Sequence, residues 1–111
     1  MQNKKPKNTS NKTYKLLDFR IKIHYVDKDT VDNRWVYGHC EYDANNANIY
    51  ISLMSEKGVK FTESELNSTL RHELFHVILR ALYIDDLAEN ETIVEWLAQS
   101  TKILNKQGLN I

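Results

Sequence analysis

The sequence predicts an α+β fold in which a small three-stranded antiparallel sheet packs on two helices. Apolar residues alternate with polar ones in three segments between residues 19 and 53, which is the pattern of half-buried strands. After Gly58 the apolar residues recur every three or four positions, which is the pattern of helices. Strands followed by helices are typical of α+β domains, and 111 residues fit one domain with a single core.

The three strands are expected over residues 19–25, 35–42 and 49–53. Gly38 lies inside the second segment, where a glycine marks a bulge or a close approach of another backbone. Residues 43–48 are rich in Asn and Asp, which tolerate left-handed backbone conformations and so favour a turn. The second and third strands should therefore pair as an antiparallel hairpin.

Two helices are expected over residues 63–83 and 90–105. The first begins with a capping box, in which Thr62 is the N-cap and the side chain of Glu65 reaches back to its backbone. A short acidic connector, residues 85–90, separates the two helices. Gly108 follows the second helix, as is common at a helix C-terminus.

Composition and charge limit the classes of function. Residues 1–15 hold five lysines and no acidic residue, so residues 16–111 hold 10 basic and 15 acidic residues. We interpret residues 1–13 as a disordered basic tail and residues 14–111 as the folded domain. The acidic body argues against nucleic-acid binding, except weakly through the tail. With neither a membrane-spanning apolar run nor a secretory signal, the cytoplasm is the expected location.

The first helix contains the sequence His-Glu-Leu-Phe-His, residues 72–76. His72 and His76 are four residues apart and therefore lie on one helical face, where both imidazoles can reach one metal ion. Glu73 flanks the ion without ligating it, which suits a general base for a metal-bound water. Zinc is the expected ion, because it accepts imidazole and carboxylate ligands and keeps one position open for water.

The third ligand is expected from the second helix, since His24 and His39 precede the first helix on the sheet. Glu91 and Glu95 are also four residues apart. We predict that Glu91 ligates the metal and that Glu95 supports a ligand histidine, with Glu95 as the alternative third ligand.

The segments 72–76 and 90–95 together resemble the gluzincin class of zinc metallopeptidases. The layout is also similar to compact intracellular members of the ImmA/IrrE-like and SprT-like kinds, which bacteria and their phages often encode. The resemblance covers about residues 19–104 and implies a minimal zincin-like domain. It assigns the ligand role to His72, His76 and Glu91, the catalytic base to Glu73 and the supporting role to Glu95.

The expected function is hydrolysis of peptide bonds in a protein or peptide, by a metal-activated water with Glu73 as general base. The donor that stabilises the oxyanion stays open among three residues: Tyr42, His39 and Tyr83. If the third strand forms an edge of the sheet near the metal, an extended substrate could add to it as a further strand. The alternative is a non-catalytic, zinc-stabilised binding or regulatory module, such as one that acts on a host factor. Cys40 is expected to be a buried, inert thiol.

Overall fold

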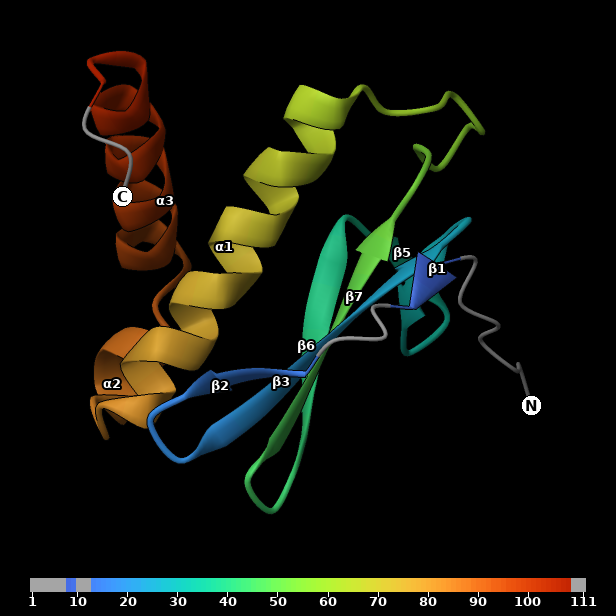
Figure 1. Ribbon diagram of the computed structural model, residues 1–111. Helices are drawn as coiled ribbons and strands as arrows, with labels where there is room; N and C mark the ends of the chain where they lie inside the picture. The colour runs from blue at the N-terminus through green and yellow to red at the C-terminus, as the bar shows by residue number, and fades with distance from the viewer. Residues whose placement is uncertain (1–7, 10–12, 109–111) are drawn as a thin grey trace.

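A computed structural model describes residues 8–9 and 13–108 of the chain as an α+β fold with a five-stranded mixed sheet, a separate two-stranded ribbon and three helices (Figure 1). The strands are β1 Asn8–Thr9, β2 Tyr14–Leu16, β3 Phe19–Val26, β4 Asp29–Val31, β5 Arg34–Val36, β6 Gly38–Asp43 and β7 Asn46–Ser52. The helices are α1 Glu63–Ala81, α2 Asp85–Ala88 and α3 Glu91–Lys106. The tail predicted over residues 1–13 lies mostly outside the described residues.

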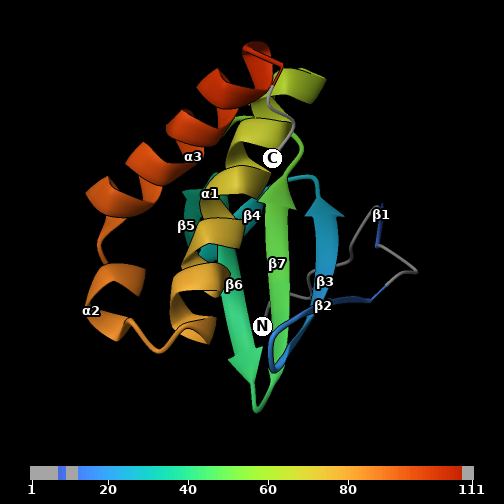
Figure 2. The ribbon, with the colours of Figure 1, turned by 60° about the vertical axis from the view of Figure 1, so that its left-hand side comes forward.

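The prediction of a three-stranded antiparallel sheet on two helices is wrong. In the described part of the chain, the main sheet has the order β1-β3-β7-β6, and β2 also pairs with β3. Strands β6 and β7 form the expected antiparallel hairpin, but β3 and β7 are parallel. Because β7 lies between β3 and β6, it is not an edge strand. The edge next to the helices is β6 instead (Figure 2).

The period-two pattern could not predict this order, because it identifies which side chains share a face but not which strands are neighbours. The pattern correctly places Ile49 and Ile51 in the core, where both are fully buried. Neighbouring strands in sequence are usually adjacent in the sheet; β2 and β3 follow this rule, but β3 does not pair with β4, the next strand of the chain. The chain leaves β3, forms the ribbon β4–β5, runs back as β6 and then inserts β7 against β3.

The expected second strand, residues 35–42, is divided between two sheets. Its first part pairs with β4 in the ribbon, and its second part pairs with β7. Gly38, the first residue of β6, lies close to the backbone of Tyr50. A Cβ atom at Gly38 would lie only 2.7 Å from the Tyr50 carbonyl oxygen, so a side chain does not fit there. Ser52 holds the ribbon to the main sheet: its hydroxyl donates to the Val36 carbonyl at 2.7 Å and accepts from the Asp29 N–H at 2.7 Å.

Helix α1 lies between the sheet and α3, so that the molecule has three layers (Figure 1). The capping box is confirmed, with Thr62 accepting from the Glu65 N–H and the Glu65 carboxylate accepting from the Thr62 N–H. Helix α1 ends at Ala81, two residues before the expected end. The acidic connector contains the short helix α2, and Asn90 caps α3 by accepting from the Ile93 N–H.

Two apolar clusters hold these layers together. The larger lies between the sheet and α1, and its fully buried members include Ile49, Ile51 and Val77. The smaller joins the three helices through Leu79, Ala88 and Val94. Among the described residues, no helix combines the length and the apolar character needed to span a bilayer.

Candidate metal centre

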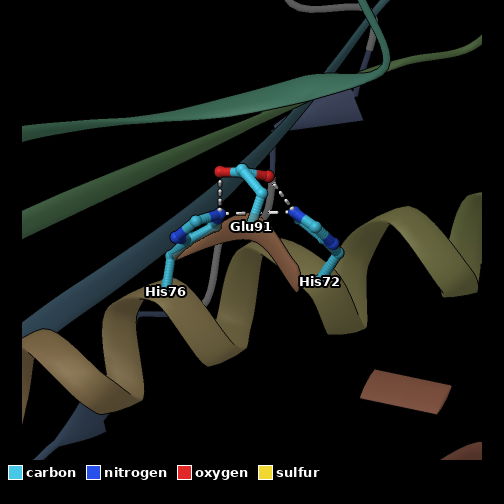
Figure 3. Close-up of side chains that lie close together, drawn as sticks. All are labelled: His72, His76 and Glu91. Carbon is cyan, nitrogen blue, oxygen red and sulfur yellow. Dashed lines mark hydrogen bonds and ion pairs between the residues drawn. The ribbon is translucent and has the colours of Figure 1, made fainter. Parts of the chain in front are cut away.

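Helix α1 places His72 and His76 on one face, one helical turn apart, and the first residue of α3 lies opposite them (Figure 3). The Nε2 atoms of the two imidazoles lie 3.3 Å apart. The Glu91 carboxylate faces both, with Oε2 at 2.8 Å from Nε2 of His72 and Oε1 at 2.9 Å from Nε2 of His76. One ligand atom from each of the three residues lies within 4.8 Å of the others.

The opposite nitrogen of each imidazole is held by a separate acceptor. Nδ1 of His72 donates to Oε1 of Glu95 at 2.7 Å. Nδ1 of His76 donates to the backbone carbonyl of Ala88, in α2, at 2.6 Å. Such contacts fix the tautomer and the ring orientation of a histidine that ligates a metal through its other nitrogen.

This set of atoms fits a bound cation. When both Nδ1 atoms carry their protons, the two Nε2 atoms of the neutral rings present lone pairs toward one another and toward the Glu91 carboxylate. Four electron-rich atoms then converge without a donor among them, and a cation between them removes that repulsion. Two imidazoles and one carboxylate are ligands that zinc accepts, with a fourth position left for water.

The structure brings together all five residues that the sequence singled out, in distinct positions. His72, His76 and Glu91 form the cluster, and Glu95 lies behind His72 and does not face His76.

The hydrogen bonds in the site shift the pKa values of its residues. Partial burial of Glu95 would raise its pKa, but hydrogen bonds from Gln99 and His72 lower it overall. Burial likewise would lower the pKa of His72, but its bonds to Glu95 and Glu91 outweigh burial and raise it.

Glu73 is buried beside the cluster, with only 7% of its surface exposed. Burial raises the pKa of its carboxyl group, against the opposing effect of His76 and His72. The Cys40 thiol lies 3.4 Å from Oε1 of Glu73 and can donate to it. Burial and the neighbouring Glu73 raise the pKa of Cys40, so that the thiol stays protonated. The thiol is half-buried, not fully buried as expected. Its contact with Glu73 was not predicted from the sequence.

Two hollows flank the cluster, one on each side, and both include Glu73 and Glu91 in their walls. The larger has a volume of about 700 Å³ and the smaller about 380 Å³. Tyr42 lines the smaller hollow, and the guanidinium of Arg80 lies 4.1 Å from the centre of its ring. Burial is the main reason that the pKa of Tyr42 is raised.

The other two candidate oxyanion donors are less suited to that role. Both ring nitrogens of His39 contact carboxylates: Nδ1 lies 2.5 Å from Oδ2 of Asp29 and Nε2 lies 2.8 Å from Oε2 of Glu41. Tyr83 is 79% exposed, does not line either hollow, and donates to Asp18 at 3.4 Å. Tyr42 and His39 both line the smaller hollow, whereas Tyr83 lines neither hollow.

Sequence reasoning missed the partners of His76 and Glu73. The acceptor for His76 is a backbone carbonyl, for which side-chain identity gives no signal. Cys40 could have been found, because Gly38, Cys40 and Tyr42 share one face of β6 by the period of two. That face packs against α1, on which Glu73 lies.

Comparisons with known protein families, with curated proteins and with solved structures give no match to this chain.

Proposed function

We propose that this protein is a zinc-dependent metallopeptidase of gluzincin type that hydrolyses a peptide bond in a protein or peptide. The observation that carries the proposal is the convergence of His72, His76 and Glu91 around one point, with a separate acceptor behind each histidine. Glu73 lies beside that point and in the wall of both hollows. An open metal site with an adjacent carboxylate is the arrangement that hydrolysis needs.

The roles of the protein residues follow from their environments. His72, His76 and Glu91 would hold the ion, while Glu95 and the Ala88 carbonyl keep the imidazoles in the ligating tautomer. When bound, zinc supplies a Lewis acid that polarises a carbonyl group and lowers the pKa of water. Glu73 accepts the proton from the attacking water and returns it to the leaving amine. Burial raises the pKa of Glu73, which makes its carboxylate a stronger base than an exposed one.

The edge strand β6 gives a place for the substrate backbone. Both hollows include residues of β6 in their walls, so the strand runs beside the metal cluster. In the described part of the chain its outer edge pairs with no other strand. An extended peptide can add to such an edge through main-chain hydrogen bonds, which replaces the earlier expectation that β7 has this role.

Zinc content and peptide turnover test the proposal together. Zinc per chain should be close to one in the purified protein and should fall sharply in His76→Ala, by elemental analysis. Wild type should cleave members of a mixed peptide library, detected by mass spectrometry of the products. Glu73→Gln, which keeps the ligands, should bind zinc and cut at least ~100-fold more slowly, because general-base catalysis contributes that much. The exposed Glu63→Gln serves as the control.

The outcomes separate the candidate functions. A wild-type protein that takes up no zinc contradicts the metal site itself. Zinc bound at the cluster, with no turnover that depends on Glu73, contradicts the peptidase and favours a zinc-stabilised binding or regulatory module. Turnover that survives both His76→Ala and Glu73→Gln indicates a contaminating peptidase.

A further inference from the structure

The larger hollow has an aromatic wall that the zinc site does not require. The rings of Trp35, Tyr37 and Phe61 contact one another, with centroids 4.7 Å apart for Trp35 and Tyr37 and 5.6 Å apart for Tyr37 and Phe61. They come from β5, from the residue between β5 and β6, and from the segment before α1. All three line the hollow that His72 and Glu73 also line.

This aromatic wall is not part of either core cluster. Tyr37 is 60% exposed, so most of its ring is available to a ligand. Neither Trp35 nor Phe61 belongs to the clusters under α1 or between the helices. Trp35 and Phe61 are half-buried, so the exposed aromatic surface of the wall comes mainly from Tyr37. Exposed aromatic surface beside polar groups is typical of a recognition site, because burying it on binding gains free energy that folding has not used.

The wall is held in place by backbone contacts. The indole N–H of Trp35 donates to the carbonyl of Met54 at 3.2 Å. The Phe61 N–H donates to the carbonyl of Leu53 at 3.0 Å. Ser52 ties the ribbon that carries Trp35 to β7. Aromatic side chains fixed in this way can bind a ligand at a small cost in conformational entropy.

The charged side chains in the rest of the hollow are mostly acidic. Its lining includes four glutamates and no lysine or arginine: Glu65, Glu73, Glu91 and Glu95. A divalent ion at the cluster would balance only part of this charge. A ligand that carries a positive charge is therefore favoured over a negative one, and a nucleic acid is repelled.

We propose that the larger hollow is the substrate subsite of this enzyme, and that it binds a peptide carrying a large apolar side chain next to a lysine or arginine. The apolar side chain packs on Trp35, Tyr37 and Phe61, and the basic side chain is attracted by the surrounding glutamates. The proposal rests on the proposed peptidase function for the nature of the occupant. It deepens that function by naming the substrate class that the site selects.

Peptide binding tests the proposal without requiring turnover. The probes are hexapeptides with a fluorophore on the N-terminal amine, Ala-Lys-Phe-Ala-Ala-Ala-amide and versions with Phe replaced by Ala or Lys replaced by Glu. Binding is measured by fluorescence anisotropy to zinc-loaded Glu73→Gln protein, alone and combined with Tyr37→Ala. The Tyr14→Ala combination is the matched control, because Tyr14 is also an exposed tyrosine and does not line either hollow.

The peptide with both Lys and Phe should bind about tenfold more tightly than the peptide without Phe, as expected for partial burial of one aromatic side chain. Tyr37→Ala should remove most of this preference, Tyr14→Ala should leave it unchanged, and Glu in place of Lys should weaken binding. Equal affinity for the Phe and Ala peptides, or a preference that survives Tyr37→Ala, would overturn the proposal.

These results are separable from the peptidase test. Zinc-dependent cleavage without any preference for an apolar side chain rejects the subsite and leaves the peptidase function standing. Binding that depends on Phe and Tyr37, in a protein whose wild type cuts no peptide, supports the subsite and rejects the hydrolase. Absence of binding by every probe rejects the subsite.

Discussion

Replacing Glu91 and Glu95 one at a time by glutamine separates the two roles that the structure gives these carboxylates. Glutamine keeps the size of the side chain and removes the charge. Glu91 faces Nε2 of both histidines, at 2.8 and 2.9 Å. Of the two histidines, Glu95 contacts only His72, at 2.7 Å from its Nδ1. On the proposed assignment, the first change removes a ligand, and the second removes a support for one ligand.

The expected magnitudes differ accordingly. Loss of a supporting residue lowers metal affinity by about 10- to 100-fold, which is roughly 1.4 to 2.7 kcal/mol. The side chain of Glu95 is 46% exposed, so solvent screening places its effect near the lower end of that range. Glu91→Gln leaves two imidazole ligands and should weaken zinc binding by more than about 100-fold, beyond the range for supporting residues.

The assay is competition for zinc against a chromophoric chelator at pH 7, with far-ultraviolet circular dichroism to confirm that each variant is folded. Glu89→Gln is the matched control, because it removes the same charge from the acidic connector without a contact to either histidine. Zinc affinity that falls more in Glu95→Gln than in Glu91→Gln would refute the assignment of the third ligand. Equal, small losses in all three variants would place the third ligand outside α3.

Three further outcomes are expected. Gly38→Val should destabilise the protein by about 1 to 3 kcal/mol in urea unfolding, because its Cβ would lie 2.7 Å from the Tyr50 carbonyl oxygen; unchanged stability would contradict the close approach. Ile49→Ala, at a fully buried position in β7, should cost about 2 to 5 kcal/mol by the same measurement, and a loss below 1 kcal/mol would contradict its place in the core. Zinc affinity should fall as the pH is lowered through the pKa of His72, which lies above its ordinary value of 6.5, because zinc and the proton compete for this imidazole. In the zinc-free protein the pH dependence of stability has the opposite sign. Protonated His72 stabilises the fold below pH 6.5, and this contribution is lost as the pH rises through the raised pKa. Urea unfolding that is independent of pH across this window, with and without zinc, would contradict both statements.

The helices and the spacing of the ligands could be predicted because both depend on local sequence. The capping box at Thr62 and Glu65 involves four consecutive residues, and the pairing of His72 with His76 follows from the geometry of one helical turn. The approach of Glu91 to the two histidines depends on α3 packing beside α1, which is a contact between helices and not a local feature of the sequence.

The sheet could not be predicted to the same extent, because strand order and direction depend on contacts distant in sequence. Ile23 and Ile49 pair across parallel strands, although nothing in either segment specifies its partner. The break between Val36 and Gly38 was also hidden, since the alternating pattern continues through it. That break places Trp35 in the ribbon and Cys40 in the main sheet, and so forms both the wall of the larger hollow and the contact with Glu73.

The candidate ligands come from two helices that pack on each other, so metal binding would affect both stability and any reaction. A stability measurement alone therefore cannot distinguish an enzyme from a binding module. The two helices that bear the ligands meet through a small apolar cluster around Val94 and Leu79. Ligands from both helices on one ion would therefore stabilise their contact in an enzyme and in a binding module alike. Glu73 distinguishes the two. A carboxyl group that is 7% exposed costs free energy to bury, and a closed structural site gains nothing from it. A buried carboxylate with a raised pKa, beside two imidazoles that converge on one point, is the base that the proposed hydrolysis needs there.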